Sequence, residues 1–498
     1  MRYSVHNFRT RLPMVNFPVL LRVMGLLLII EASFLLVPLG TCLAYGESDW
    51  KAFLISFGIT LVSGCVMTFA IHPSSPSMGK REGFLLTAMV WVFFSTFGML
   101  PFILMNERPL SVSDAFFEAM SGFTTTGASI MSSISHLSHG AIIWRSLMQW
   151  IGGMGIILFT LAVIPMLNHS GGMQMFNAEV TGITHDKLRP RISQTAKSLW
   201  LIYFSLTAVL FGLLYVGPME GFDSVCYAFS IMSTGGFATS DEGLHLWRSD
   251  YIEAVTTFFM FIGGVSFTLI YRAVHRDFRS VWHNDVFRTY IGIVALCYVL
   301  FTVNILMRGE YTGLKSVTLD PLFQIVSMIS STGFEIPQFA SWGTFAISLV
   351  LVLMFFGACA GSTSGGAKID RLVIMLKNCR NEIERCIHPN NILTVRLNGK
   401  VIPHETVSKV VAFLSIYVLV ILVGGILLTA MGLPLIDAFF SAFTCISNTG
   451  LSAGVTGYGS TFSIVPDAGK WLLALIMLIG RLELFTVLLL FTPAFWRK

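Results

Sequence analysis

Long apolar runs alternate along the chain with short polar breaks. Two runs come first, at residues 18–39 and 52–71, and four pairs follow. The first members of the pairs cover 84–105, 199–216, 290–307 and 410–431, and the second members cover 142–167, 255–271, 345–356 and 471–491. Because roughly 20 apolar residues cross a bilayer as a helix, the pattern predicts an all-α polytopic membrane protein with about ten full transmembrane helices.

A polar segment that begins with aspartate lies between the two members of each pair. The four segments read DAFFEAMSGFTTTG, DSVCYAFSIMSTGG, DPLFQIVSMISSTG and DAFFSAFTCISNTG. Each has a glycine 13 residues after its aspartate (127−114, 236−223, 333−320, 450−437) and Ser or Thr seven residues after it. This self-similarity predicts four pseudo-symmetric repeats, each with the order span, re-entrant pore helix, span.

Each segment is typical of a half-helix that enters the membrane and a loop that returns. Aspartate favours a helix N-cap and the positive end of the helix dipole, so the sequence predicts pore-helix N-caps at Asp114, Asp223, Asp320 and Asp437. The apolar stretch then turns to Ser, Thr and Gly, where the helix should stop. Small residues can also serve close helix packing, but four copies in one register argue against that alternative.

Non-helical backbone at membrane depth is tolerated only if it is buried in protein or lines a watery cavity. Four such loops around one central axis can turn their main-chain carbonyls inward and replace the hydration shell of a monovalent cation. Glycine suits this role because a Cβ would restrict the backbone or clash across a narrow pore. The sequence therefore predicts a cation pathway at the centre of the four repeats.

Two features break the apolar pattern below these loops. The run that begins at Phe345 gives way to GACAGSTSGGAK, residues 357–368, before apolar residues resume. Glycine at this density weakens a helix, so a loop within the membrane is expected there. Arg481 lies inside the last apolar run, where an arginine is costly and normally faces the protein interior or a partner.

Composition and charge support the membrane assignment. The chain is 54% hydrophobic and 12% charged, and its mean hydropathy is +0.74. The net charge of +5 comes from Lys and Arg that collect on one side of the predicted spans. This asymmetry follows the positive-inside rule and predicts a cytoplasmic N-terminus, with membrane lipid and no nucleic acid as partner. The first apolar run has no clear cleavage site and is expected to stay as an anchor.

Catalytic and metal-binding patterns do not emerge from the sequence. The eight cysteines are scattered, and the spacing of Cys379, Cys386 and His388 matches no strong zinc pattern. A membrane-embedded enzyme needs facing acids, bases or metal ligands, but the sequence has no HExxH or Gly-x-Ser-x-Gly motif. We therefore expect a transporter and not an enzyme, and no covalently bound cofactor.

The motifs TTTG, STGG, SSTG and SNTG, together with GSTSGGAK at 361–368 and GRLELFTVLLLFTP at 480–493, resemble the Trk/Ktr/HKT superfamily of potassium transporters. The resemblance covers nearly the whole chain and is closest to the bacterial TrkH/TrkG membrane subunit, because the first two apolar runs are a pair that the Ktr subunit lacks. It implies potassium uptake across the bacterial cytoplasmic (inner) membrane, with the potassium ion as substrate.

The resemblance also implies site residues. The implied potassium filter consists of Thr124, Thr125, Thr126, Gly127, Ser233, Thr234, Gly235, Gly236, Ser330, Ser331, Thr332, Gly333, Ser447, Asn448, Thr449 and Gly450. The implied gate consists of Gly357, Gly361, Ser362, Thr363, Ser364, Gly365, Gly366, Lys368 and Arg481. A serine in place of Gly127 goes with sodium transport in related proteins, so this chain should prefer potassium; a sodium-preferring or poorly selective transporter of the same fold is the alternative. Glu335 and Leu451 depart from the family pattern next to the third and fourth loops.

Partners and domains complete the sequence-based picture. The resemblance implies a homodimer and a cytosolic, nucleotide-binding TrkA-type regulatory ring, for which the stretches 168–197 and 371–409 have a suitable size. The expected domains are an N-terminal helix pair at 1–80, pore repeat 1 at 81–196, pore repeat 2 at 197–286, pore repeat 3 at 287–407 with the gating loop at 357–368, and pore repeat 4 at 408–498.

Overall fold

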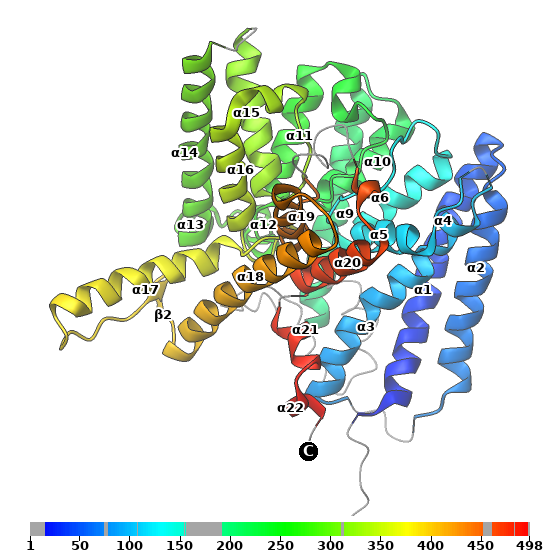
Figure 1. Ribbon diagram of the computed structural model, residues 1–498, viewed down its shortest axis with the longest axis horizontal. Helices are drawn as coiled ribbons and strands as arrows, with labels where there is room; N and C mark the ends of the chain where they lie inside the picture. Colours follow the sequence, from blue (N-terminus) through cyan, green and yellow to red (C-terminus); the bar gives the residue numbers. More distant parts are fainter. Residues whose placement is uncertain are drawn as a thin grey trace, which may run out of the picture.

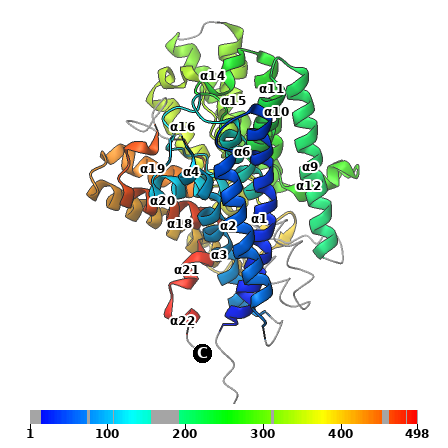
Figure 2. The ribbon, with the colours of Figure 1, turned by 90° about the vertical axis from the view of Figure 1, so that its right-hand side faces the viewer.

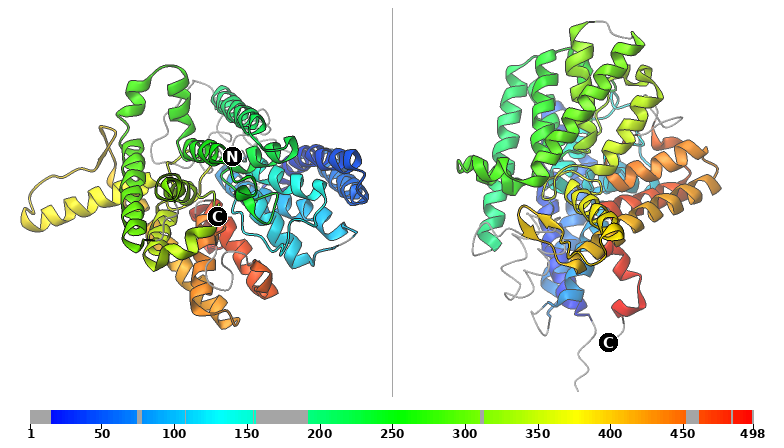
Figure 3. Two further views of the ribbon diagram at one scale, coloured as in Figure 1. Left: turned by 90° about the horizontal axis from the view of Figure 1, so that it is seen from above. Right: turned by 90° about the vertical axis from the view of Figure 1, so that its left-hand side faces the viewer.

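The computed structural model describes residues 15–73, 78–106, 108–153, 155, 192–309, 313–451, 461–482 and 484–496. The end of the predicted span 142–167 and most of the stretch 168–197 lie outside these residues. Seen from above, the helices follow one another around the molecule in sequence order, from the N-terminal pair through the green and yellow segments to the red C-terminal one (Figure 3).

The N-terminal pair stands at one edge of the molecule, beside α3 (Figures 1 and 2). It consists of α1 (Phe17–Tyr45) and α2 (Trp50–Cys65), which continues as the π-helix η1 (Val66–Ala70). The two helices pack closely because Gly25 of α1 faces Gly64 of α2, where a Cβ on either glycine would overlap the backbone of the other helix.

Four units of similar build follow the N-terminal pair. Their first spans are α3 (Lys80–Gly98, followed by α4, Leu100–Leu104), α9 (Ile192–Val216), α14 (Asp285–Arg308) and α18 (His404–Ala430). Their short central helices, the pore helices, are α5 (Val112–Phe123), α10 (Gly221–Met232), α15 (Leu314–Ile329) and α19 (Leu435–Ser447). Their second spans contain α6 (His139–Gly153), α11 (Asp250–Gly263) with α12 (Phe267–Val274), α16 (Gly343–Phe356), and α20 (Asp467–Arg481) with α21 (Phe485–Leu490).

Contacts between these helices repeat from unit to unit. Each pore helix packs against the first span before it and the second span after it. Each second span also packs against the pore helix of the next unit, in the pairs α6–α10, α11–α15, α16–α19 and α20–α5. The last pair returns from the fourth unit to the first, so the four units close on one another.

The membrane character predicted from the sequence is confirmed, and several spans differ in detail. Among the described residues, six helices are long and apolar enough to cross a membrane, and a bent pair makes up to seven. That pair is α11 and α12; the chain bends by 106° between them, within the span expected at 255–271. The backbone groups freed at the bend are satisfied, because Cys359 N–H donates to the Gly264 carbonyl (3.0 Å) and Phe267 N–H donates to the Gly361 carbonyl (2.9 Å).

Short elements connect and extend the four units. The connectors are η3 (Gly243–Trp247), α13 (Phe278–Trp282), η4 (Pro337–Trp342) and η6 (Phe462–Ile464), and α22 (Pro493–Trp496) lies near the C-terminus. α17 (Ile369–Ile387) projects away from the bundle with a hairpin of β1 (Arg396–Leu397) and β2 (Lys400–Val401), as Figure 1 shows. The hairpin is antiparallel, with Arg396 opposite Val401, and it is an exception to the predicted all-α fold.

The predicted N-caps of the pore helices are wrong in all four units. α5 is capped by Ser111, whose hydroxyl accepts from Asp114 N–H (3.2 Å). Asp114, Asp223 and Asp437 lie in the first turns of α5, α10 and α19, where they still meet the positive end of the dipole. Asp320 lies well inside α15, because the helix starts at Leu314 and continues through Pro321. In each unit the residues just before the aspartate already have helical geometry, so the helix begins upstream of the aspartate.

Candidate functional site

The four pore helices end in the same hydrogen-bonded cap. At the end of α5, Thr126 N–H donates to the Ser121 carbonyl (2.9 Å) and Thr125 N–H donates to the Gly122 carbonyl (3.0 Å). These bonds, which reach back five and three residues, form a Schellman cap, which closes a helix with one residue in the left-handed region. The equivalent five-residue bonds join Gly235 to Ser230, Thr332 to Ser327 and Thr449 to Thr444. The Ser or Thr seven residues after each aspartate is therefore the carbonyl acceptor of this cap.

The left-handed residues of these caps are not the usual ones. Glycine or asparagine is common at such a position, but three units place Thr125 (φ 54°), Thr234 (φ 53°) and Ser331 (φ 56°) there, and only the fourth has an asparagine, Asn448 (φ 51°). A β-branched residue with positive φ is an outlier that costs about 1–3 kcal/mol and is found mainly at functional sites. The loops that contain Thr125 and Thr234 thus hold a strained backbone, and Ser331 gives the third loop an uncommon one.

The glycine that follows two residues later joins each loop to the next. Gly127, Gly236, Gly333 and Gly450 all have positive φ, between 73° and 84°. A Cβ on any of these four would overlap the main-chain carbonyl oxygen of the neighbouring loop. The pairs are Gly127 with Gly235, Gly236 with Thr332, Gly333 with Thr449, and Gly450 with Thr126. We number the loops in chain order: loop 1 is 124–127, loop 2 is 233–236, loop 3 is 330–333 and loop 4 is 447–450. The contacts run from loop 1 to loops 2, 3 and 4 and back to loop 1, so four main-chain carbonyls form a closed ring.

Hydroxyl pairs connect the first and third residues of three of the four loops. Thr124 and Thr126 lie 2.8 Å apart at their hydroxyls, Ser330 and Thr332 lie 2.7 Å apart, and Ser447 and Thr449 lie 3.0 Å apart. Loop 4 is also tied to loop 1, because Asn448 Nδ2 donates to Thr126 Oγ1 (2.9 Å). These buried hydroxyls therefore help to hold the loops in position.

Loop 2 has no such pair, because its third residue is Gly235. The side chain of Gln149, from α6, occupies the space instead. Its Nε2 donates to the Gly235 carbonyl (2.7 Å), and its Oε1 accepts from Ser230 Oγ (2.9 Å) and Phe237 N–H (3.1 Å). Gln149 is fully buried, so all three bonds are shielded from water.

Replacing Gln149 with methionine is expected to weaken loop 2 selectively. The change keeps the side-chain length but leaves three buried polar groups without a partner, at a cost of about 1–3 kcal/mol each. We expect a lower melting temperature in detergent and a lower selectivity for potassium over sodium. Gln194→Met, at an exposed position on α9, is the control. Unchanged melting and unchanged selectivity in Gln149→Met would show that the three bonds contribute little.

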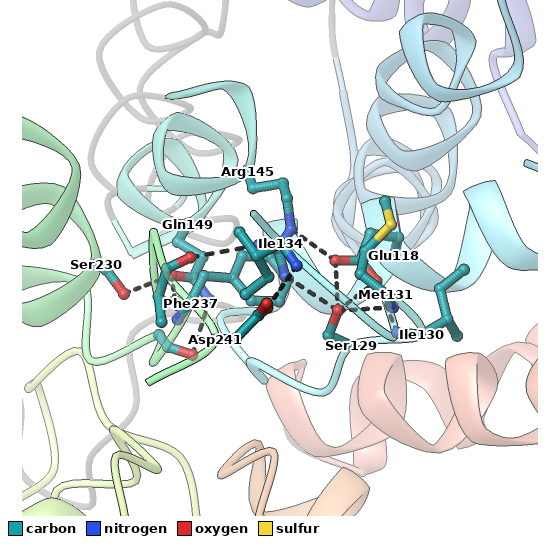
Figure 4. Close-up of polar contacts among 12 residues, drawn as sticks. Glu118, Ser129, Ile130, Met131, Ile134, Arg145, Gln149, Ser230, Phe237 and Asp241 are labelled. Carbon is teal, nitrogen blue, oxygen red and sulfur yellow. Dashed lines mark hydrogen bonds and ion pairs between the residues drawn. The ribbon is translucent and has the colours of Figure 1, made fainter. Parts of the chain in front are cut away.

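A buried ion pair holds the outer ends of loops 1 and 2 together (Figure 4). Arg145 Nε donates to Glu118 Oε1 (2.8 Å), and the two side chains are 1% and 0% exposed. Glu118 also accepts from Ile130 N–H (3.0 Å), beyond Gly127, and the Arg145 guanidinium lies 4.1 Å from the ring centroid of Phe237, beyond Gly236. The pair thus connects the segments that follow Gly127 and Gly236.

Breaking this pair is expected to destabilise the protein strongly. Arg145→Leu leaves the Glu118 carboxylate buried without its cation, which costs about 3–5 kcal/mol. The double variant Arg145→Leu/Glu118→Gln removes the uncompensated charge and should recover part of the loss. Melting of the purified protein, followed by size-exclusion chromatography after heating, measures both effects. A single variant as stable as the wild type contradicts this role for Arg145.

A second contact joins the same two outer segments at the surface. Asp241 accepts from Ser133 Oγ (2.9 Å), Ile134 N–H (2.6 Å) and Ser135 Oγ (2.6 Å). Partial burial raises the pKa of Asp241, but these donors outweigh burial and hold the pKa below its ordinary value. The contact therefore stabilises the fold above the ordinary aspartate pKa and is lost as the pH falls through the lowered one.

The glycine-rich segment 357–368 lies against the ends of three pore helices. Gly365 N–H donates to Ser331 Oγ (2.6 Å) of loop 3, and Thr234 Oγ1 of loop 2 donates to Thr363 Oγ1 (3.2 Å). A Cβ on Gly365 would overlap the Ser447 carbonyl at the end of α19. The helix interruption predicted from the glycines is present, and it lies next to the ring of loops.

Arg481 connects this segment to the remaining unit. Its Nη1 donates to the Thr363 carbonyl and its Nη2 donates to the Gly152 carbonyl of α6, each at 2.9 Å. Lys368 is 4% exposed and donates from Nζ to the Ser364 carbonyl within the same segment. Two positive side chains, the buried Lys368 and the partly buried Arg481, therefore lie at the segment, and Arg481 bridges it to the first unit.

Three residues that support these loops, Glu118, Arg145 and Gln149, were not singled out by the sequence analysis. One signal was available: Glu118 and Gln324 both lie four residues after the aspartate of their repeat. The two side chains accept equivalent hydrogen bonds: Ile130 N–H donates to Glu118 (3.0 Å), and Ile336 N–H donates to Gln324 (3.1 Å). A polar side chain at this position of a buried pore helix must find a hydrogen-bond partner, so it indicates a contact with the segment beyond the loop.

Comparisons with known proteins agree with this arrangement. Residues 50–498 match the family model of TrkH, described as a cation transport protein. The chain is 34% identical over 486 residues to the Trk system potassium uptake protein TrkH of Escherichia coli (strain K12), which covers 97% of this chain and 100% of that protein. It is 31% identical over 475 residues to the Trk system potassium uptake protein TrkG of the same strain, which covers 95% and 97%. The crystal structure of the potassium transporter TrkH from Vibrio parahaemolyticus superimposes with a TM-score of 0.87 at 33% identity, over 97% of this chain and 100% of that one.

Proposed function

Because this chain belongs to the TrkH family of cation transport proteins, we propose that it takes up potassium through a selectivity filter made by its four loops. The observation that carries the proposal is the closed ring in which each filter glycine meets the carbonyl of the next loop. Main-chain carbonyls in such a ring replace the water around a potassium ion. The C-terminal, negative ends of four pore helices add attraction for a cation at the centre.

The filter is proposed to consist of the four residues at each pore-helix end, from Thr124–Gly127 to Ser447–Gly450. Glycine at the last position of all four favours potassium, since the family resemblance links a serine in place of Gly127 to sodium transport. The Gly235 carbonyl keeps one lone pair for the ion, because Gln149 uses only the other. The four pore repeats, with the boundaries expected from the sequence, are our proposal for the domain organisation.

We propose that the segment 357–368 is the gate of this pathway. It contacts loops 2 and 3, the end of α19 and, through Arg481, α6. A segment in this place, with the positive charges of Arg481 and Lys368, opposes the passage of cations. Opening requires the loop to move away, and the glycines at 357, 361 and 366, all with positive φ, give its backbone that freedom.

Orientation and partners are also proposals. The charge asymmetry supports a cytoplasmic N-terminus in the bacterial inner membrane. The Trk resemblance supports a homodimer and a TrkA-type nucleotide-binding ring on the cytoplasmic side. The projecting α17 and its hairpin offer a surface for such a partner (Figure 1). Co-purification with a TrkA-type protein, and its loss when 388–403 is replaced by a flexible linker, tests the docking site.

Complementation tests the function as a whole. The chain is expressed in a bacterium that lacks its own potassium uptake systems, with and without a TrkA-type partner. We expect growth on limiting potassium and uptake of rubidium, with little uptake of sodium. Sodium uptake equal to rubidium uptake would favour the sodium-preferring or poorly selective alternative. Uptake of neither ion, with the partner present, would reject transport.

A further inference from the structure

His245 of η3 touches the outer end of loop 3 from the neighbouring unit. Its Nε2 lies 3.2 Å from the carbonyl oxygen of Glu335, which is two residues after Gly333. Its Nδ1 lies 3.2 Å from Glu253 Oε1 on α11. The ring is packed edge-on against Phe323 of α15, with centroids 6.2 Å apart, and the side chain is 18% exposed.

Both partners of the ring accept hydrogen bonds. A main-chain carbonyl is an acceptor only, and so is an ionised carboxylate. A neutral imidazole has one N–H and satisfies one of the two contacts, whereas the protonated ring has two N–H groups and satisfies both. The geometry at His245 is therefore complete only with the imidazolium form.

The charges around the ring match a positive imidazole. Glu253 is 2% exposed and pairs with Lys315 (2.8 Å), which also pairs with Asp250 (3.0 Å). Asp320, which is 6% exposed, lies in the same electrostatic cluster, where burial disfavours its charged form and raises its pKa. The Glu253 and Asp250 carboxylates thus face one ammonium and the His245 ring, so a protonated ring balances their charge.

Residues 334–336 follow loop 3. Among their hydrogen bonds in the described structure, only the contact between His245 and the Glu335 carbonyl comes from another unit. The neighbouring residues are held by α15 itself: Ser327 Oγ donates to the Phe334 carbonyl (2.7 Å), and Gln324 accepts from Ile336 N–H (3.1 Å). Glu335 lies between these two attachments. A bond from His245 therefore restrains the backbone directly beyond Gly333.

We propose that His245 is a positioning residue whose protonation braces loop 3 and makes potassium selectivity depend on external pH. The inference rests on the proposed function, because it assigns His245 a role in the same filter. Histidine changes its charge between about pH 5 and 8. In the protonated state the ring donates to both Glu253 and Glu335, and in the neutral state one of these bonds is lost. Selectivity should fall as the external pH rises through this range.

The test is the ratio of rubidium to sodium uptake in proteoliposomes at external pH 5.5 and 8. For the wild type we expect a ratio about threefold or more higher at the lower pH. His245→Gln should have a low ratio that does not change with pH. His245→Arg keeps a positive charge with several donors, so it should be selective at both values. His136→Gln, at an exposed loop position, should behave as the wild type.

The outcomes separate this inference from the proposed function. A wild type that selects rubidium equally at both pH values, or a His245→Gln variant with the wild-type pH profile, overturns the role of His245 and leaves potassium uptake in place. A wild type without rubidium uptake overturns the proposed function instead. Size-exclusion profiles of His245→Gln and His245→Arg identify misfolded protein, and a purely structural role would lower both uptakes without changing their pH dependence.

Discussion

Gly127→Ser is expected to remove potassium selectivity. Gly127 has φ 81°, and a Cβ there would overlap the carbonyl oxygen of Gly235 in the next loop. A side chain must therefore move one of the four ring carbonyls, in addition to about 1–3 kcal/mol of backbone strain. Since each 1.4 kcal/mol is a factor of ten, we expect the ratio of rubidium to sodium uptake to fall about tenfold or more.

The matched control is Gly46→Ser, after α1. Gly46 has φ 71°, but nothing lies within 4 Å of the position that its Cβ would take. This variant has similar backbone strain without contact with a carbonyl, so it should retain the wild-type selectivity. The explanation by a ring contact is wrong if both variants lose selectivity equally, or if Gly127→Ser keeps it while the protein remains folded.

Arg481→Ala is expected to raise the rate of potassium flux, most of all without a cytosolic partner. The variant loses the two bonds that tie the segment 357–368 to α6 and removes a positive charge from the proposed pathway. Bonds from a charged group contribute about 1.5–3 kcal/mol each. Even one of them shifts the balance between closed and open states about tenfold or more. Rubidium uptake into proteoliposomes, per folded transporter, measures the change.

Two further variants separate charge from bonding at this position. Arg481→Lys keeps the charge but cannot span both carbonyls, so its flux should lie between those of the wild type and Arg481→Ala. Arg276→Ala removes an exposed arginine outside the pathway and should leave the flux unchanged. A flux in Arg481→Ala at or below the wild-type level, with normal folding, would mean that Arg481 does not hold a closed gate.

The loops were predictable because their chemistry is local and is repeated. A glycine at a constant distance from an aspartate, with Ser or Thr before it, marks the end of a helix wherever it occurs. The structure places all four of these ends in equivalent caps. The interruption at 357–368 was predictable for the same reason, since glycine density is a property of the segment itself. The family resemblance added an expected role for each position.

The side chains that hold the loops in place, which we call their supports, were not predictable in this way. Arg145 and Glu118 are 27 residues apart, and Gln149 reaches Gly235 across 86 residues. The sequence does not say that these side chains meet, because their contact depends on how α6 packs between two pore helices. The helix starts were also misjudged, since Ser111 caps α5 in competition with Asp114. Local propensity does not decide between two neighbouring capping residues.

The supports also differ between loops of similar shape. Loop 1 has an ion pair, loop 2 has Gln149, loop 3 has Gln324 and His245, and loop 4 has Asn448. Four unlike sets of side chains therefore hold four similar backbones. A substitution of Gln149 or Gln324 should act on one loop, whereas a change in the Arg145–Glu118 pair or at Asn448 should act on two. The ring is therefore expected to tolerate such changes unequally.

The measurement that tests the central claim most directly is anomalous X-ray scattering from crystals of the wild-type protein grown in rubidium. We predict an anomalous peak on the axis of the ring formed by the carbonyls of Thr126, Gly235, Thr332 and Thr449, and its loss in crystals of Gly127→Ser. A wild-type crystal with rubidium peaks elsewhere and none within the ring would contradict a potassium filter built from these four loops.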